Sequence, residues 1–310
     1  MKYIIFTSSW DEKIGGVVCL HKLCDTINRL GGQAFLYPTF DIVEFDRFSF
    51  FRSLRRVFKN YFRSKKTLSV NSKFITPSFY GDVADLRGGD WVVVYPEVIY
   101  GNPLGAKNVV RWLLHNPGFH TGKIGYSAGD VFFRFNSAIK DFSFYGAVLP
   151  GIDLKVIHYP TDLYNMKNIE SCREGTAYCL RKGRDKKITH DLADSILIDN
   201  KPHAEVASIF KAAEIFYSYD TYTAYSLFAV MCGCKSVVIP DAGVPIESWY
   251  PDSSDRLGIA YGIDEIAAAA ETADEAIKRV YVEIEESDNN VKKFISFCEA
   301  HFLCDEIKTC

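Results

Sequence analysis

A short polar turn after an apolar stretch has the residue types and spacing expected of an anion-binding site. Residues 215–219 have the composition of a buried β-strand, and the polar residues 220–223 follow directly. Residues 223–232 fit a helix, for which Thr221 and Thr223 are suitable caps. The start of such a helix presents free backbone N–H groups and the positive end of its dipole, which suits a diphosphate. The same pattern also occurs in doubly wound folds without a ligand, so a structural role stays open.

A basic cluster adjoins another expected strand of the same half. Residues 176–180 are apolar enough for a buried strand, and residues 181–187, RKGRDKK, follow at once. Cations at the end of a strand would face the same sheet edge as the polar turn, where they could neutralise a phosphate. A solvated loop is the alternative, because most charge runs are solvated.

The amino-terminal half holds a carboxylate and two imidazoles in comparable places. Residues 91–95 predict a buried strand, and Glu97 lies just beyond it as an acid/base or acceptor-contact candidate. His115 follows an expected helix over 103–114, and His120 is close behind. An exposed loop carboxylate and a structural histidine are the alternatives.

These side chains require a scaffold that gathers loops at one edge of a sheet. A strand over 3–7, a turn at Gly15 and Gly16, a helix over 17–30 and a strand over 34–37 form a βαβ unit. Such a unit implies a parallel sheet with a ligand crevice at the carboxyl ends of its strands. The pattern restarts after the Pro150-Gly151 pair, which predicts a second α/β domain. Its further expected elements are strands over 195–198 and 234–239 and helices over 203–213, 266–286 and 291–302.

Composition sets broad limits. The formal charge of -3 gives no global reason to expect a nucleic-acid partner. Nine cysteines without CxxC spacing fit a reducing cytoplasm, and we find no segment with the length and apolarity of a signal peptide core or a membrane-spanning helix. We expect no catalytic metal, because the sequence lacks a DxD motif at a strand end and a clustered His/Cys set.

Residues 50–66, FFRSLRRVFKNYFRSKK, interleave basic and aromatic side chains at helical spacing. This composition suits peripheral contact with the cytoplasmic face of an inner membrane, where anionic lipid and apolar burial act together. A helix packed by its aromatic side chains with a basic outer face fits equally well. Nucleic acid would need similar residues, but no recognised binding module accompanies them.

The stretch 216–249, FYSYDTYTAYSLFAVMCGCKSVVIPDAGVPIESW, resembles the donor-binding motif of GT-B glycosyltransferases, particularly bacterial enzymes that build O-antigen and capsule. An acidic residue, a Ser/Thr-rich turn, an alanine-containing helix, a CG pair, a valine-rich strand and a proline loop follow in the family's order. The resemblance implies two Rossmann-like domains, 1–150 for the acceptor and 151–285 for a nucleotide-sugar donor, with an active-site cleft between them. It further implies that 286–310 returns to the amino-terminal domain, that the acceptor is a glycan or lipid-linked glycan, and that no separate cofactor is needed.

The resemblance also assigns roles to single residues. Asp220 corresponds to the acid that contacts the donor sugar, while Thr221, Tyr222 and Thr223 occupy the turn near the diphosphate. Arg181 and Lys187 are the expected diphosphate cations, and Gly15 and Gly16 match a glycine turn that lets substrate approach closely. We take Asp220, Glu97 and His115 as the candidate catalytic residues.

The chain departs from this family at one position. Many members carry a second glutamate that holds the ribose, and this sequence has Phe228 there. Phe228 therefore motivates a rival from another class, a catalytically inactive nucleotide- or polysaccharide-binding protein on the same fold. A Rossmann-type oxidoreductase would need a GxGxxG turn after the first strand, which this sequence lacks.

Overall fold

The computed structural model describes residues 1–39, 68–136, 139, 145–250 and 252–304. The chain forms two compact units, each of mixed α/β structure. Unit 1 comprises Met1–His158 and Ile284–Cys310, and unit 2 comprises Tyr159–Glu283. The basic aromatic segment 50–66 lies outside the described residues.

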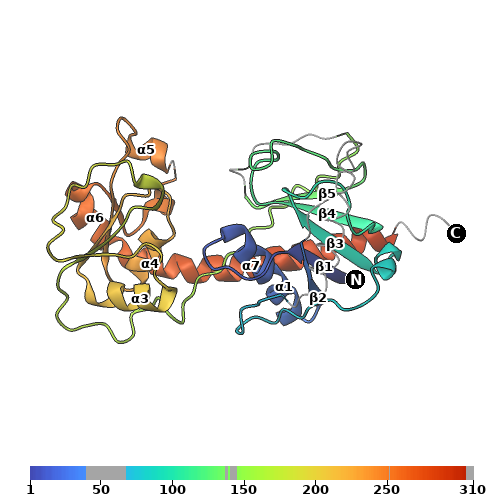
Figure 1. The fold of residues 1–310 in the computed structure, drawn as a ribbon, viewed down its shortest axis with the longest axis horizontal. Helices are drawn as coiled ribbons and strands as arrows, with labels where there is room; N and C mark the ends of the chain where they lie inside the picture. Colours follow the sequence, from blue (N-terminus) through green and yellow to red (C-terminus); the bar gives the residue numbers. More distant parts are fainter. Residues whose placement is uncertain (40–67, 137–138, 140–144, 251, 305–310) are drawn as a thin grey trace, which may run out of the picture. The chain divides into compact units, whose positions relative to one another are not determined.

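Unit 1 is built on a five-stranded parallel sheet with strand order β2-β1-β3-β4-β5 (Figure 1). The order changes direction beside β1, so loops from both sides of the switch gather at the carboxyl ends of the strands. The strands are β1 (Lys2–Thr7), β2 (Gln33–Pro38), β3 (Trp91–Pro96), β4 (Asn108–Leu113) and β5 (Val131–Arg134), and the helices are α1 (Gly15–Arg29) and the 3₁₀ helix η1 (Val83–Arg87).

The helix expected over residues 103–114 is wrong, because residues 108–113 form the strand β4. All six of its residues are buried, so the strand shows neither the alternation of a half-buried strand nor a polar helix face. The chain reaches β4 through a turn in which Gly105 has φ +62°, a conformation that ends any preceding helix. Valine and tryptophan at the centre of β4 suit a sheet covered on both faces.

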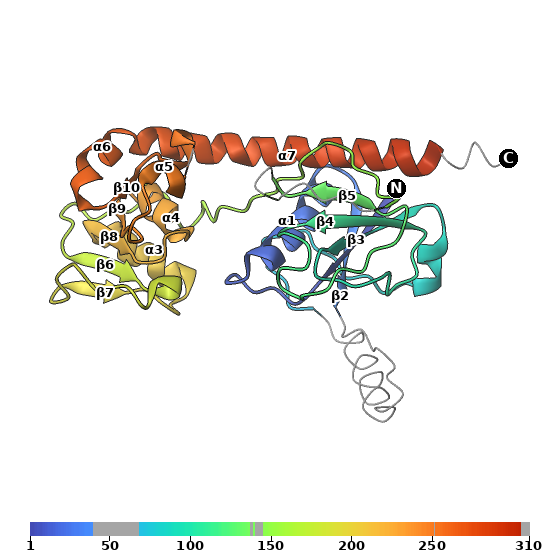
Figure 2. The ribbon, with the colours of Figure 1, turned by 90° about the horizontal axis from the view of Figure 1, so that it is seen from above.

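The last helix, α7 (Ala273–Cys304), completes the core of unit 1 with its carboxyl-terminal part. Figure 2 shows this part of α7 running beside β5. The ring of Phe294 lies 5.6 Å from that of Tyr3 and 5.1 Å from that of Phe133. The buried apolar residues that α7 contributes to this core are Val291, Phe294, Cys298 and Phe302.

Helix α7 is continuous where the sequence suggested a break after residue 286. The polar run 287–290, SDNN, stays helical because its side chains find partners in unit 1. Ser287 Oγ accepts a hydrogen bond from the backbone N–H of Ile157 at 3.1 Å, and Asp288 binds the Arg29 guanidinium at 2.6 Å. Tertiary contacts here override the turn preference of Ser, Asp and Asn.

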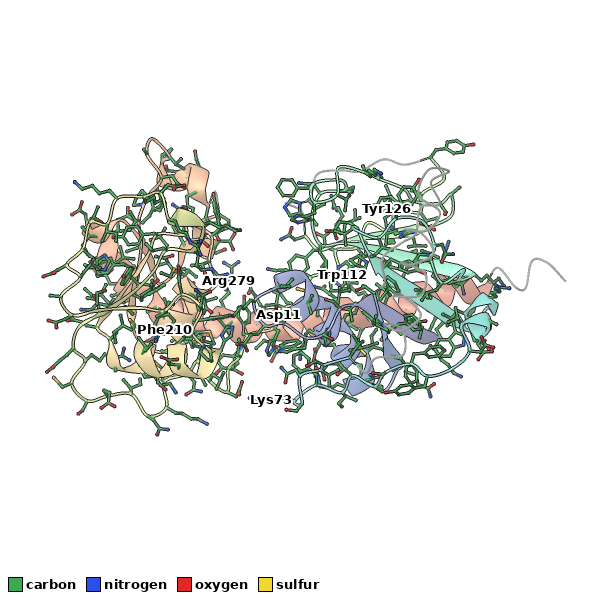
Figure 3. All side chains as sticks on the ribbon, viewed as in Figure 1. Asp11, Lys73, Trp112, Tyr126, Phe210 and Arg279 are labelled. Atoms are coloured by element: carbon green, nitrogen blue, oxygen red, sulfur yellow. The ribbon has the colours of Figure 1, made fainter. Side chains whose placement is uncertain are left out.

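A buried ion pair in unit 1 links β4 to Asp130, the residue that precedes β5. Arg111 on β4 is fully buried, and its Nε donates to Asp130 Oδ2 at 2.8 Å. The guanidinium also lies 4.9 Å from the ring centroid of Tyr95 and 5.1 Å from that of Tyr126, which is labelled in Figure 3. Its terminal nitrogens donate to the carbonyls of Ile99 and Gly101, so the charge is paired and hydrogen-bonded.

Unit 2 is built on a second five-stranded parallel sheet, with order β10-β9-β8-β6-β7. Its strands are β6 (Thr176–Cys179), β7 (Ser195–Leu197), β8 (Ile215–Ser218), β9 (Lys235–Val238) and β10 (Ile259–Tyr261). Its α-helices are α3 (His203–Ala212), α4 (Tyr225–Met231), α5 (Ile246–Trp249) and α6 (Ile266–Glu271), and its 3₁₀ helices are η2 (Arg181–Gly183), η3 (Ser253–Arg256) and η4 (Ile263–Glu265).

One arginine ties the ends of two helices of unit 2 together. Arg173 Nη1 donates to the carbonyls of Phe210 (labelled in Figure 3) at 3.0 Å and Ala213 at 3.1 Å, and Nη2 donates to that of Cys232. These carbonyls lie at the carboxyl ends of α3 and α4, where no further turn of helix supplies a partner. A cation also suits the negative end of both helix dipoles.

The segment after the Pro150-Gly151 pair still belongs to unit 1. Leu154 and Val156 are buried in its core, and the backbone N–H of Leu154 donates to Arg134 at the end of β5. The expected domain boundary therefore lies slightly before the division at His158 and Tyr159.

Among the described residues, no helix combines the length and apolarity needed to cross a bilayer.

Candidate functional site

Asp220 lies at the carboxyl end of β8 and anchors the polar turn of unit 2. Its side chain is buried, with 4% of the residue exposed, and Oδ1 accepts a hydrogen bond from the backbone N–H of Tyr222 at 3.2 Å. Ser218 Oγ donates to the Asp220 carbonyl at 2.6 Å. The carboxylate is thus fixed in place by the turn while Oδ2 faces Arg181 at 3.7 Å.

Arg181 is held beside Asp220 by a hydrogen bond of its backbone and by the contact of its guanidinium with the ring of Tyr225. Its N–H donates to Asp199 Oδ2 at 3.0 Å, and its φ of +41° is uncommon for a residue with a side chain. The guanidinium lies 5.2 Å from the ring centroid of Tyr225, and the side chain is 38% exposed. Within the described part of the chain, its terminal nitrogens Nη1 and Nη2 make no hydrogen bond, and the guanidinium is paired with Asp220 through Nε. Arg181 therefore presents an oriented fork of donors suited to a phosphate or carboxylate.

Gly183 allows the Arg181 loop to reach the Asp220 turn. A Cβ on Gly183 would lie 1.9 Å from the carbonyl oxygen of Tyr219, a distance that no side chain tolerates. The loops after β6 and β8 are therefore in backbone contact, and any residue other than glycine at position 183 would separate Arg181 from Asp220.

Lys186 joins three loops of the same sheet edge. Its ammonium donates to Thr221 Oγ1 at 3.2 Å and to the Ile239 carbonyl at 2.7 Å, and it pairs with Asp241 Oδ1 at 2.7 Å. Thr221 in turn donates to Asp241 Oδ2 at 2.8 Å, and these hydrogen bonds from Lys186 and Thr221 hold the pKa of the Asp241 carboxyl below its usual value. An ammonium has three N–H donors, and all three donors of Lys186 have partners within the protein. Lys186 therefore connects the three loops.

The remaining predicted residues of unit 2 lie around this cluster. Tyr222 is largely exposed, and its hydroxyl donates to the Trp249 carbonyl at 3.3 Å. Thr223 Oγ1 accepts from the first helical N–H, that of Tyr225, at 3.3 Å, whereas Thr221 binds Asp241 and caps no helix. Helix α4 has only seven residues, so its dipole contributes less than the sequence pattern suggested. Lys187 is exposed and, among the described residues, makes no ion pair or hydrogen bond.

Phe228 fills space inside unit 2. It is buried on α4 and stacks on Tyr164 with ring centroids 4.4 Å apart and an interplanar angle of 18°. Tyr164 comes from the segment that precedes β6 and is itself fully buried. Phe228 therefore packs in the interior of unit 2 and offers no polar group to a ligand hydroxyl.

In unit 1, Glu97 lies just beyond β3 and is almost fully buried. Its Oε2 accepts a hydrogen bond from the backbone N–H of Leu114 at 3.1 Å, and its own carbonyl accepts from the Tyr126 hydroxyl at 2.9 Å. Burial raises the pKa of the Glu97 carboxyl above its ordinary value, although the backbone donors and the charges of His120 and His115 oppose the shift.

His115 follows β4 instead of a helix, and this places it at the same sheet edge as Glu97. Its Nδ1 accepts from the N–H of Asn116 at 2.8 Å, and its ring lies 4.1 Å from that of Phe119 and 4.9 Å from that of His120. The structure thus groups Glu97, His115 and His120, of which His120 was noted in the sequence but given no role.

Gly15 and Gly16, expected as a turn before a helix, are the first two residues of helix α1 and lie near these loops. Helix α1 begins at Gly15, and a Cβ on Gly16 would lie 3.6 Å from Leu114 Cδ1. That distance is ordinary van der Waals contact, so Gly16 is not required by packing in the structure. The start of α1, with Gly15 and Gly16, therefore lies near the loops after β3 and β4 that carry Glu97 and His115.

We expect Glu97→Gln to leave the fold as stable as wild type, or more stable, at pH 7. A buried acid with a raised pKa favours folding only while protonated, so its contribution is complete below the unfolded pKa of about 4.3 and is lost as the pH rises through the folded pKa. Glutamine keeps the acceptor for Leu114 without the buried charge. Unfolding free energies measured from pH 4 to pH 8 should show the advantage of the variant growing with pH, and a less stable variant at pH 7 would show that the carboxylate supports the fold.

Sequence reasoning missed three contributors in unit 2. Lys186 was passed over for its neighbour Lys187, and Asp241 and Asp199 received no role. Asp199 follows β7 and Asp241 follows β9, so both occupy strand-end positions of the kind that singled out Asp220. A search of every expected strand end for carboxylates would have found them.

Among the described residues, no group of three or more His, Cys, Asp and Glu side chains is placed to hold a metal ion. The site in unit 2 therefore consists of one oriented guanidinium, one buried carboxylate and a lysine-tied set of loops. The site in unit 1 consists of a buried carboxyl group and two imidazoles.

No protein-family model matches this chain, and no curated protein is significantly similar to it.

Proposed function

We propose that the protein is a nucleotide-sugar-dependent glycosyltransferase of GT-B type, acting in the synthesis of bacterial surface polysaccharide. The observation that carries the proposal is the placement of Arg181 beside Asp220 at the carboxyl edge of a parallel sheet, with terminal guanidinium donors that make no hydrogen bond to a described residue. Such sheet edges are the usual ligand sites of open α/β folds. The sequence resemblance of residues 216–249 to a donor-binding motif supports the same assignment.

In this proposal the Arg181 fork binds the donor diphosphate. Two parallel N–H donors match two phosphate oxygens, and the positive charge stabilises the nucleoside diphosphate as it leaves. Asp220 accepts hydrogen bonds from the donor sugar, and its negative charge favours the electron-poor sugar of the transition state. Thr221, Tyr222 and Thr223 complete the turn that holds both.

Unit 1 supplies the acceptor side of the proposal. Glu97 and His115 lie at the carboxyl edge of its sheet, where a carboxylate or imidazole could accept a proton from an acceptor hydroxyl. Gly15 and Gly16 leave room for substrate beside them. The acceptor is a glycan or lipid-linked glycan, no metal or separate cofactor is required, and residues 50–66 would bring the protein to the membrane that carries the acceptor.

The proposal is tested by measuring nucleoside diphosphate affinity in Arg181 variants. Calorimetric titration with UDP, GDP and ADP first identifies the nucleotide. Arg181→Ala should then weaken binding by about 1.5 to 3 kcal/mol, the value of a hydrogen bond to a charged group. Arg181→Lys should recover part of the loss, because it restores the charge without the fork.

Lys182→Ala is the matched control, since Lys182 is an exposed cation of the same loop and should leave affinity unchanged. Lys187→Ala, measured in parallel, tests the expectation from the sequence that Lys187 binds the donor diphosphate together with Arg181. Equal affinities of wild type and Arg181→Ala for every nucleotide would overturn the proposed donor site.

A binding protein without catalysis is the second candidate, and buried Phe228 favours it. The absence of a carboxylate at position 228 removes the ribose contact typical of the resembled family. Release of nucleoside diphosphate from a bound nucleotide sugar, measured with and without acceptor glycan, separates the candidates. Tight donor binding with no release in either condition would favour the binding protein.

A further inference from the structure

We propose that two exposed aromatic rings of unit 1, Phe119 and Tyr100, form a stacking platform for a pyranose ring of a glycan. This inference rests on the proposed function for its biological meaning, because the platform would hold the acceptor. The geometry that supports it concerns unit 1 alone. We call the rings of Phe119 and Tyr100 the aromatic platform. Glu97, His115 and His120 lie in the neighbouring part of unit 1.

Each ring is backed by the protein and exposed to solvent. Phe119 is 68% exposed, yet its ring lies 4.1 Å from that of His115 and meets His120 edge-on at 5.0 Å. Tyr100 is 50% exposed, and its ring lies so close to the backbone of Gly125 that a Cβ there would be 1.9 Å from Tyr100 Cε2. Both rings are therefore supported in position, which reduces the entropy lost when a ligand stacks on them.

The two rings belong to one group of loops. The N–H of Gly101, next to Tyr100, donates to the Gly125 carbonyl at 2.7 Å, which joins the loop after β3 to the loop after β4. A Cβ on Gly118, beside Phe119, would lie 3.2 Å from Ile124, in the same second loop. Val98 and Ile124, on the same two loops, add exposed apolar surface.

A sugar fits this surface better than an acyl chain does. A pyranose has an apolar C–H face, which suits an aromatic ring, and a rim of hydroxyls that can satisfy carboxylate and imidazole groups. Both are present here, because the imidazole rings of His115 and His120 adjoin the ring of Phe119. An acyl chain would cover these polar groups without hydrogen-bonding them, at a cost in desolvation.

The test measures sugar binding by the full-length protein without nucleotide. The probes are methyl pyranosides of glucose, galactose, mannose, rhamnose and N-acetylglucosamine, screened by saturation-transfer NMR and then titrated. Phe119→Ala and Tyr100→Ala should each weaken the best probe by roughly tenfold, whereas Phe119→Tyr should bind within about twofold of wild type, since it keeps the ring. Tyr80→Ala is the matched control, because Tyr80 is an exposed aromatic residue of unit 1 outside these loops and should bind like wild type.

The remaining outcomes separate this proposal from its alternatives. No saturation transfer from any methyl pyranoside, or equal losses in Tyr80→Ala and Phe119→Ala, would overturn the platform. Binding of octyl but not methyl pyranosides would assign the surface to an acyl chain and overturn it as well. Nucleoside diphosphate affinity should be unchanged in Phe119→Ala, so failure of the donor site in the Arg181 series and failure of the platform would be seen independently.

Discussion

Asp220→Asn should lower sugar transfer by about 10²-fold or more while changing nucleoside diphosphate affinity only modestly. Asparagine keeps the Oδ1 acceptor for the Tyr222 N–H, so the turn and the fold should persist. What disappears is the negative charge, which faces Arg181 in the free protein and the electron-poor sugar in the transition state. Turnover and melting temperature are measured on the same preparation.

A structural role for Asp220 gives the opposite pattern. If the residue only shapes the turn, the asparagine variant should turn over donor at nearly the wild-type rate, and the catalytic assignment fails. Asp199→Asn serves as the control, because Asp199 holds the Arg181 backbone by accepting hydrogen bonds but is not assigned to the donor. A much larger loss of transfer in Asp220→Asn than in Asp199→Asn would show that the charge of Asp220 acts in sugar transfer, and that the loss does not come from a disturbed loop.

Asp130→Asn should destabilise unit 1 by about 3 to 5 kcal/mol. Asparagine retains the acceptor for the Ser127 N–H but leaves the fully buried Arg111 without its counter-ion. An uncompensated buried charge costs far more than a broken surface pair. The measurement is equilibrium urea unfolding followed by tryptophan fluorescence, to which Trp10, Trp91 and Trp112 of unit 1 contribute.

The matched control for this stability prediction is Glu214→Gln in unit 2. Glu214 pairs with Lys235 at 3.0 Å, and both side chains are about half exposed, at 51% and 47%. Loss of such a pair should cost about 0 to 1 kcal/mol. A similar small cost for Asp130→Asn would show that Arg111 is stabilised by its carbonyl and ring partners without the carboxylate.

Much of the mixed α/β architecture was readable from local pattern. Most strands of both sheets are short apolar runs between polar turns. Helix α1 was expected after a turn at Gly15 and Gly16, but it begins at Gly15, so both glycines are helical. The strand β4 was misassigned because a strand buried on both faces has no alternation, and an apolar run of this kind fits a helix equally well. The three residues of β10 are all apolar, so they show no alternation that marks a strand.

The site was only partly predictable, for a different reason. Asp220 was found because a carboxylate directly after a buried strand is a local signal. The choice between Lys186 and Lys187 depends on which side of an irregular loop faces Thr221 and Asp241, and no period defines that in sequence. The stacking of Phe228 on Tyr164 joins residues far apart in the chain and has no local trace.

The division of the chain between the two units has a consequence for its synthesis. Unit 2 is one continuous segment, Tyr159–Glu283, whereas the core of unit 1 includes Phe294 and other side chains of the carboxyl-terminal part of α7. Translation proceeds from the amino terminus, and domains generally fold as units once their residues are available. Unit 2 therefore has all its residues before unit 1 does, even though unit 1 emerges first from the ribosome. Until residue 294 has been synthesised, Tyr3 and Phe133 lack the ring of Phe294 that covers them in the folded protein.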